Sequence, residues 1–172
     1  MDRGIMEIRR LGGESNSTLE SFHCKDVPLN NFLRRKAKKH QKEMLSVTYL
    51  LYIEDEIVGY YSLSADTILA TEKELTKFTK GKTYKTYPAI KIGRLAIAEK
   101  YSGQNIGSWL LDAVKFKYAN EPQSIGVRYL VVDSLADSTG FYEKNNFQYW
   151  TENDRDEKTR LMYFDLKSAK ML

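Results

Sequence analysis

The chain has little of three things: cysteine, proline and long apolar runs. Cys24 is the only cysteine among 172 residues, which excludes an internal disulfide and a cysteine-based zinc site. Three prolines, with 42% hydrophobic and 29% charged residues, argue against a disordered chain. No apolar run approaches the ~20 residues of a membrane span, and no signal-peptide core follows Met1. We therefore expect a single globular domain over residues 1–172, without membrane contact and cytoplasmic by default.

Positive charge is concentrated in one segment. The 27 Lys and Arg residues against 23 Asp and Glu residues give a net charge of +4. Six of these cations fall within residues 34–42, which contain no acidic residue. One interpretation is the solvated face of a helix, and the other is a phosphate-binding surface. The composition leaves both open.

The pattern of apolar residues predicts an α+β fold, with a sheet of about seven strands and helices on both faces. Helical spacing predicts one helix after Asp26, a second from about residue 105 and a short one that carries residues 138–144. A polar loop is expected over 12–17, and a short helix and loop over 72–86. The expected strands cover residues 5–11, 46–53, 57–64, 89–98, 127–133, 147–151 and 160–166.

The helix after Asp26 separates apolar from basic residues. At 100° per residue, one apolar stripe holds Leu29, Phe32, Leu33, Ala37 and Met44. The opposite side holds Arg34, Arg35, Lys38 and Lys42. Lys36 and His40 fall near the stripe, and we interpret them as side chains that extend past its edge to water. The alternative is that they point into a site beneath the helix.

A loop that opens the second helix carries a pattern typical of anion binding. Gly103 lies in this loop and Gly107 lies just inside the helix. The first N–H groups of a helix lack internal partners, and the helix dipole adds positive charge there, so such an end binds phosphates. Asn105 tolerates the left-handed conformation that such a loop needs, and Ser108 adds a hydroxyl. The alternative is an ordinary strand–loop–helix connection.

Residues 94–111 resemble the acetyl-coenzyme A loop of the GNAT N-acetyltransferases. Leu95-Ala-Ile97 matches the family's strand, and Gly107 matches the last glycine of its Arg/Gln-x-x-Gly-x-Gly/Ala pattern. Ser102 stands where Arg or Gln is usual, and Asn105 stands for the first glycine.

A second signature, Phe141-Tyr-Glu-Lys-Asn-Asn-Phe147, resembles the family's Phe-Tyr-x-x-x-Gly-Phe. Asn146 replaces its glycine, at an expected left-handed position after a helix. The resemblance covers roughly residues 20–166 and is closest to the acetyltransferase toxins of toxin–antitoxin pairs. Leu29–Leu33, Val58–Ser64 and Pro88–Ala96 contribute to it.

This resemblance implies the GNAT fold with a mixed central sheet, and acetyl-CoA as cofactor. Toxins of this subgroup acetylate the α-amine of the amino acid on charged tRNA and are inhibited by a ribbon-helix-helix antitoxin. The implied partners are therefore tRNA and such an antitoxin, and homodimers are common in the subgroup. Two rival interpretations stay open: a GNAT enzyme that acetylates a small-molecule amine or a protein N-terminus, and a non-catalytic nucleic-acid-binding protein that retains the fold.

The resemblance also implies direct attack of the amine on the thioester, in agreement with the position of Cys24 outside both signatures. Tyr142 matches the family's tyrosine acid, which protonates the leaving thiolate. The alternative for Tyr142 is a core aromatic, but adjacent helical residues diverge by ~100°, which opposes burial of both Phe141 and Tyr142. The base stays open between Glu99 and Asp133. An α-amine on an ester is less basic than a lysine, so the lack of an evident base favours it.

The residues implied in acetyl-CoA binding are Leu95, Ala96, Ile97, Ser102, Gly103, Gln104, Asn105, Ile106, Gly107, Ser108 and Ser138. The residues expected to contact tRNA phosphates are Arg34, Arg35, Lys38, Lys39 and Lys42.

Overall fold

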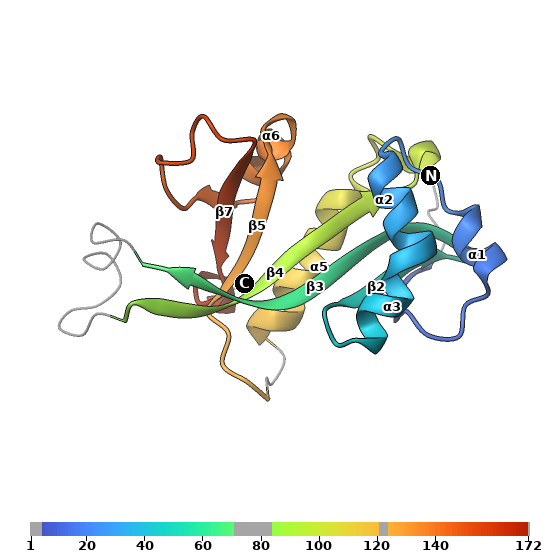
Figure 1. Ribbon diagram of the computed structural model, residues 1–172, viewed down its shortest axis with the longest axis horizontal. Coiled ribbons are helices and arrows are strands. Elements are labelled where there is room, and N and C mark those ends of the chain that lie inside the picture. Colours follow the sequence, from blue (N-terminus) through green and yellow to red (C-terminus); the bar gives the residue numbers. More distant parts are fainter. Residues whose placement is uncertain (1–4, 71–83, 121–123, 172) are drawn as a thin grey trace. The chain divides into compact units, whose positions relative to one another are not determined.

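A seven-stranded mixed sheet, in the order β1-β2-β3-β4-β5-β7-β6, organises the computed structural model (Figure 1). The structure describes residues 5–70, 84–120 and 124–171. Strands β4 and β5 are parallel, through Ala89–Lys91 and Tyr129–Val131, and the other described registers are antiparallel. The α+β class and the strand number agree with the sequence prediction.

The strands are β1 (Met6–Arg10), β2 (Val47–Ile53), β3 (Glu56–Leu69), β4 (Thr86–Ile97), β5 (Tyr129–Leu135), β6 (Gln148–Tyr149) and β7 (Thr159–Asp165). The α-helices are α1 (Asn16–Ser21), α2 (Val27–Asn31), α3 (Ala37–Lys42), α5 (Ile106–Asn120) and α6 (Thr139–Lys144). A π-helix, η1 (Phe32–Lys36), joins α2 to α3, and the 3₁₀ turns are η2 (Glu99–Tyr101), η3 (Ala136–Ser138) and η4 (Ser168–Met171).

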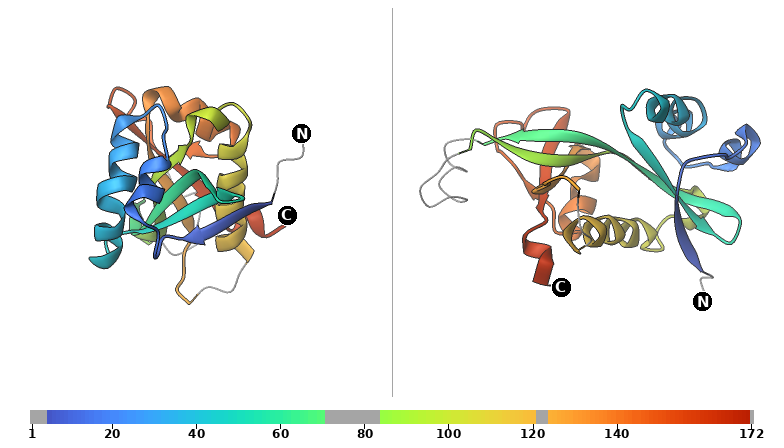
Figure 2. Two further views of the ribbon diagram at one scale, coloured as in Figure 1. Left: turned by 90° about the vertical axis from the view of Figure 1, so that its right-hand side faces the viewer. Right: turned by 90° about the horizontal axis from the view of Figure 1, so that it is seen from below.

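The chain divides into two compact units. The first comprises residues 1–64 and 92–112, and the second comprises residues 65–91 and 113–172. In the first unit α1, α2 and α3 group on one face of the strands (Figure 2). Their buried side chains include Phe22 and Phe32 and pack with Tyr60 and Ala96. In the second unit Tyr129 and Trp150 belong to a separate aromatic core.

The helix after Asp26 begins as expected but winds differently. The Asp26 carboxylate accepts a hydrogen bond from the Leu29 N–H at 3.0 Å. The π-helix adds a residue to one turn, so the side chains that follow are rotated from a regular helix. Met44 is 92% exposed, so its assignment to the apolar stripe is wrong. The helix ends at Lys42, and Met44 takes φ 55° where the chain turns toward β2.

Other boundaries also differ from the prediction. Helix α1 begins at Asn16, inside the expected polar loop, and continues to Ser21. The Ser15 hydroxyl accepts a hydrogen bond from the Thr18 N–H at 3.1 Å and caps this helix. Strand β5 continues to Leu135, so Asp133 lies inside that strand rather than at its end. Most of the helix and loop expected over 72–86 falls on residues 71–83, outside the described residues. Among the described residues, no helix is long and apolar enough to cross a membrane.

Candidate functional site

The end of β4 is held closely against β3. The Ala98 N–H donates to the Val58 carbonyl at 2.8 Å. A Cβ on Gly59 would lie 2.8 Å from Ile97 Cδ1 and 3.0 Å from the Ala96 carbonyl oxygen. Only glycine fits this approach, because real Cβ contacts are longer and a backbone oxygen cannot rotate away. Gly59 therefore fixes the position of Ala96 and Ile97 before the chain enters the loop.

The loop that follows presents a run of unpaired backbone N–H groups. The N–H groups of Tyr101 and Ser102 donate to Ala98 and Glu99, and the N–H of Trp109 donates to the Asn105 carbonyl. Between them, the N–H groups of residues 103–108 have no hydrogen-bond acceptor within the part of the chain that the structure describes. Residues 106–108 form the first turn of a 15-residue helix, where the helix dipole is positive, and residues 103–105 directly precede it.

The backbone conformation of this loop depends on two left-handed residues. Gly103 has φ 77° and Asn105 has φ 60°, so the left-handed conformation predicted for Asn105 is confirmed. A Cβ on Gly103 would have no atom within 4 Å, so the loop is open on that side. Residues 102–105 are exposed, whereas Ile106 is buried and anchors the helix. Open N–H groups with positive helix-end charge match a diphosphate, as the acetyl-CoA prediction requires.

Tyr142 lies on α6 in the second unit. Its side chain is 8% exposed, and its ring packs edge-on against Phe141 at 5.2 Å and Phe147 at 5.5 Å between centroids. Phe141 is more exposed, as the divergence of adjacent helical residues predicts. Burial raises the pKa of Tyr142 to about 12, so the hydroxyl is protonated at neutral pH. Its hydroxyl makes no hydrogen bond to any residue that the structure describes.

The end of α6 is fixed by its C-terminal turn and by a buried lysine. Asn146 has φ 63°, which confirms the predicted left-handed position, and the Phe147 N–H donates to the Tyr142 carbonyl at 3.0 Å. Lys115, only 6% exposed, donates from Nζ to the Asn145 carbonyl at 2.7 Å. Lys115 is not among the residues predicted from the sequence. Its spacing four residues after Leu111 places it on the buried stripe of α5, and that is the signal that would have found it.

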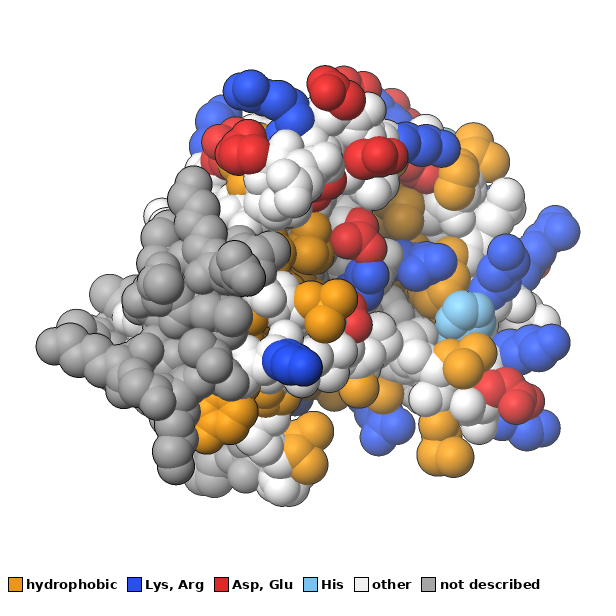
Figure 3. Space-filling view, turned by 60° about the vertical axis from the view of Figure 1, so that its left-hand side comes forward, with side chains coloured by type: hydrophobic (Ala, Val, Ile, Leu, Met, Phe, Trp, Pro, Cys, Tyr) orange, Lys and Arg blue, Asp and Glu red, His pale blue; other side chains and the backbone are white. Residues whose placement is uncertain are grey.

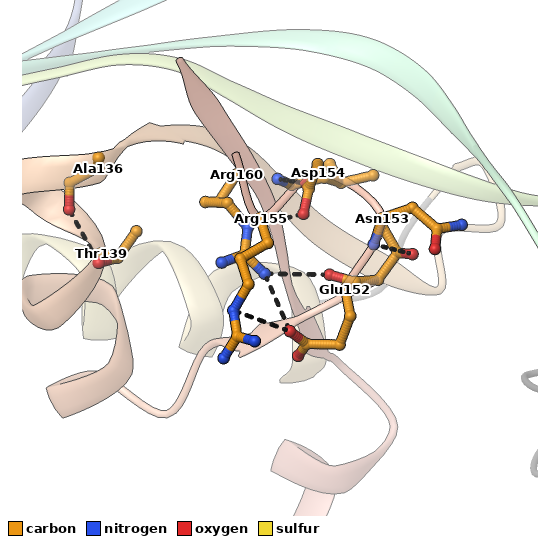
Figure 4. A network of polar contacts seen from close by, with 9 residues as sticks. Ala136, Thr139, Glu152, Asn153, Asp154, Arg155 and Arg160 are labelled. Carbon is orange, nitrogen blue, oxygen red and sulfur yellow. Dashed lines mark hydrogen bonds and ion pairs between the residues drawn. The ribbon is translucent and has the colours of Figure 1, made fainter. Parts of the chain in front are cut away.

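The loop between β6 and β7 is fixed by Arg160 (Figure 4). Arg160 Nε donates to Asp154 Oδ1 at 2.6 Å, and its Nη2 lies 3.7 Å from Glu152 Oε2. Arg155 lies 4.0 Å from the same Glu152 oxygen. The same view includes the start of α6, where the Thr139 hydroxyl donates to the Ala136 carbonyl at 3.0 Å.

The basic segment divides into inward and outward residues. Arg34 is half-buried and donates to the Phe22 carbonyl at 2.6 Å, so it is not part of the exposed surface that the wheel predicted. Lys38 Nζ donates to the Glu14 carbonyl. The other four cations of this segment make no hydrogen bond or ion pair with any described residue. We term them the basic face: Arg35, Lys36, Lys39 and Lys42. Figure 3 shows several Lys and Arg side chains at the right-hand edge of the view, with others spread over the same face.

The two candidate bases differ in their surroundings. Asp133 forms an ion pair with Lys91, which also lies 3.7 Å from Asp66. Glu99 is exposed, and its Oε2 lies 3.9 Å from His23 Nε2.

Cys24 is unsuited to act as a nucleophile. It is buried, and burial raises the pKa of its thiol, so little thiolate forms at neutral pH. Its Sγ donates to the Asp26 carbonyl.

The predicted acetyl-CoA residues fall into two groups. Leu95 to Ile97 and residues 102–108 all belong to the first unit, where β4, the loop and the start of α5 are continuous. Ser138 belongs to the second unit, in η3 directly before α6. Its side chain makes no capping hydrogen bond to α6.

Comparison with known proteins gives consistent matches. A family model described as an acetyltransferase (GNAT) domain matches residues 45–149. A tRNA-acetylating toxin of Mycobacterium tuberculosis (strain ATCC 25618 / H37Rv) is 25% identical over 146 residues, covering 84% of this chain and 86% of the toxin.

Solved structures agree in fold. AtaT complexed with acetyl-methionyl-tRNAfMet has a TM-score of 0.79 and 23% identity, covering 97% of this chain and 98% of that chain. A mutant AtaT toxin bound to the C-terminus of the antitoxin AtaR and acetyl-CoA has a TM-score of 0.76 and 22% identity, covering 96% of each chain.

Proposed function

We propose that the acceptor of this protein is the α-amine of an aminoacyl-tRNA. The premise is that the chain belongs to the acetyltransferase (GNAT) domain family and is an acetyl-CoA-dependent N-acetyltransferase. The basic face on α3 and η1 is the observation that carries the choice of acceptor. Similarity to a tRNA-acetylating toxin, and to AtaT in complex with acetyl-methionyl-tRNA, supports it. Acetylation of charged tRNA would make the protein a translation-blocking toxin that acts in the cytoplasm.

The loop before α5 is the proposed acetyl-CoA site. When bound, acetyl-CoA supplies the thioester whose carbonyl carbon the amine attacks, so that a C–N bond forms and the C–S bond breaks. The N–H groups of residues 103–108 would hold the diphosphate, and the Ser108 hydroxyl would add one donor. The Ile97 N–H, at the end of β4, is the proposed donor to the thioester oxygen.

Tyr142 is the proposed acid. Its hydroxyl would give a proton to the departing sulfur, and burial keeps that proton in place because it raises the pKa of Tyr142 to about 12. A thiol is a stronger acid than such a phenol, so this proton transfer is uphill. The phenolate that it leaves would take a proton from water, which restores Tyr142 for the next turnover.

The acceptor amine must lose its own proton before it attacks. An aminoacyl ester has a weakly basic α-amine, so a substantial fraction is neutral at pH 7 without a strong base. Asp133 or Glu99 would take the proton that the amine releases on attack, directly or through water. A weak base such as a carboxylate is sufficient for an α-amine on an ester, but not for the more basic amine of a lysine side chain.

The basic face would bind the phosphates of the tRNA acceptor arm. Arg35, Lys36, Lys39 and Lys42 are exposed cations on consecutive helical turns, and such contacts position a nucleic acid without reading its bases. A relative binds the C-terminus of an antitoxin, so an antitoxin is a further proposed partner.

A panel of acceptors tests this proposal. The purified protein is incubated with acetyl-CoA and, in turn, aminoacyl-tRNA, the free amino acid, a peptide with a free N-terminus and a polyamine, and released CoA thiol is titrated. We expect the highest kcat/KM with aminoacyl-tRNA. Preference for the peptide or the polyamine would assign a different acceptor, and no CoA release with any acceptor would favour a binding protein.

A further inference from the structure

Arg94 on β4 is a half-buried guanidinium to which the proposed chemistry gives no role. Its Cζ lies 4.3 Å from the centroid of the Phe32 ring. Among the described residues it makes one hydrogen bond, from Nη1 to the adjacent Gly93 carbonyl at 3.3 Å. A guanidinium carries five N–H donors, so most of the Arg94 donors are free to bind a ligand.

The ring beneath Arg94 is held rigidly. Phe32 is 3% exposed, and it stacks on Tyr60 with centroids 6.3 Å apart and an interplanar angle of 16°. The His40 ring meets its edge at 5.2 Å. A guanidinium held on a fixed aromatic face loses little freedom when it binds an anion, and its planar fork matches two phosphate oxygens.

Arg94 and Ile97, the proposed thioester donor, lie on the same strand, so their separation along the backbone follows from the strand geometry. Arg94 precedes Ile97 by three residues, which is roughly 10 Å along a strand. The two side chains lie on opposite faces, since Arg94 contacts Phe32 whereas Ile97 and Leu110 lie near Gly59. At the 3′ end of an aminoacyl-tRNA the amino acid is esterified to the terminal adenosine. The path from its α-amine to the 5′ phosphorus of that adenosine spans about eight bonds, roughly 9 Å when extended.

We propose that Arg94, supported by the Phe32 ring, binds the phosphate 5′ to the terminal adenosine of the aminoacyl-tRNA acceptor. This assignment rests on the proposed function and deepens it. Arg94 would anchor the end of the acceptor strand, whereas the basic face would bind phosphates farther along it. The enzyme would then require one phosphate close to the ester in addition to overall negative charge.

Two small acceptors test the assignment. Both are adenosines that carry an amino acid through a 3′-amide link, and only one carries a 5′-phosphate. For the unaltered protein we expect kcat/KM to be at least about tenfold higher with the phosphate, as one charge-assisted bidentate contact supplies. Arg94→Gln should remove this preference while kcat/KM for the phosphate-free acceptor stays the same. Arg94→Lys should keep part of it, because an ammonium binds phosphate without the fork.

Arg9 offers a matched control. Its guanidinium also lies over a tyrosine ring, Tyr52 at 4.6 Å, but it is paired with Glu7 at 2.6 Å. Arg9→Gln should therefore keep the full phosphate preference. The affinity for acetyl-CoA, measured by calorimetry, checks that each variant is folded and separates this phosphate from those of the cofactor.

The outcomes are distinct. An equal phosphate preference in Arg94→Gln, or no preference in the unaltered protein, overturns the assignment and leaves the proposed function standing. The second of these results needs no variant to fold. If neither nucleoside acceptor is acetylated while a peptide or polyamine is, the proposed function fails, and the assignment of Arg94 fails with it.

Discussion

Replacement of Tyr142 by phenylalanine removes one hydroxyl and keeps the ring that packs against Phe141 and Phe147. Because the hydroxyl has no hydrogen-bond partner among the described residues, its loss leaves no described group unsatisfied. We expect the free energy of unfolding to change by less than about 1 kcal/mol. Loss of a general acid should lower kcat by about 10²- to 10⁴-fold, or roughly 3–5 kcal/mol of transition-state stabilisation.

The assay is release of CoA thiol with saturating aminoacyl-tRNA, beside a calorimetric measurement of the acetyl-CoA dissociation constant. That constant should be unchanged, because the proposed diphosphate site lies before α5 and not on α6. Tyr163→Phe is the control, since it removes a tyrosine hydroxyl that donates to Gln148 at 2.9 Å on the exposed end of the sheet. A folded Tyr142→Phe protein with kcat within threefold of the unaltered protein would refute the acid role.

Three further predictions concern packing, charge and pH. Gly59→Ala places a Cβ 2.8 Å from a side-chain carbon and 3.0 Å from a backbone oxygen. It should lower the free energy of unfolding by about 2 kcal/mol and Tm by about 4–8 °C, measured by calorimetry. Gly93→Ala is the control and should change Tm little, because the nearest atom to its Cβ would lie at 3.9 Å. Neutralising three residues of the basic face together should weaken tRNA binding and flatten its salt dependence in a filter-binding titration; unchanged binding by a folded variant would exclude that surface. Burial raises the pKa of Tyr142 to about 12, so kcat on an amide-linked acceptor should rise as the amine deprotonates and then stay level until the pH approaches 12. A fall in kcat near neutral pH would assign the acid elsewhere.

Local rules predicted the features that depend on one residue and its immediate neighbours. Asn105 and Asn146 replace family glycines and take left-handed φ values of 60° and 63°, because asparagine tolerates that region better than most residues. Asp26 caps a helix as its position before Pro28 predicts. Tyr142 is buried and Phe141 less so, since adjacent helical side chains diverge.

Features that depend on tertiary packing were not predictable. The π-helix over Phe32–Lys36 departs from the regular 100° step of a helical wheel, and Arg34 within it turns inward to the Phe22 carbonyl. Met44 is exposed because the helix ends at Lys42, before the chain turns toward β2. The need for glycine at Gly59 arises from the approach of Ala96 and Ile97, far along the chain. The position of Arg94 over Phe32 likewise joins two distant segments.

The most direct test locates the acetyl group itself. The protein is incubated with aminoacyl-tRNA and acetyl-CoA that carries an isotopically labelled acetyl group. A nuclease then releases the terminal aminoacyl-adenosine from the tRNA, and tandem mass spectrometry locates the label within this fragment. We predict that the label is on the α-nitrogen of the amino acid. Label confined to the nucleoside, or label absent from the tRNA but present on a peptide or small amine under the same conditions, would contradict the proposed function.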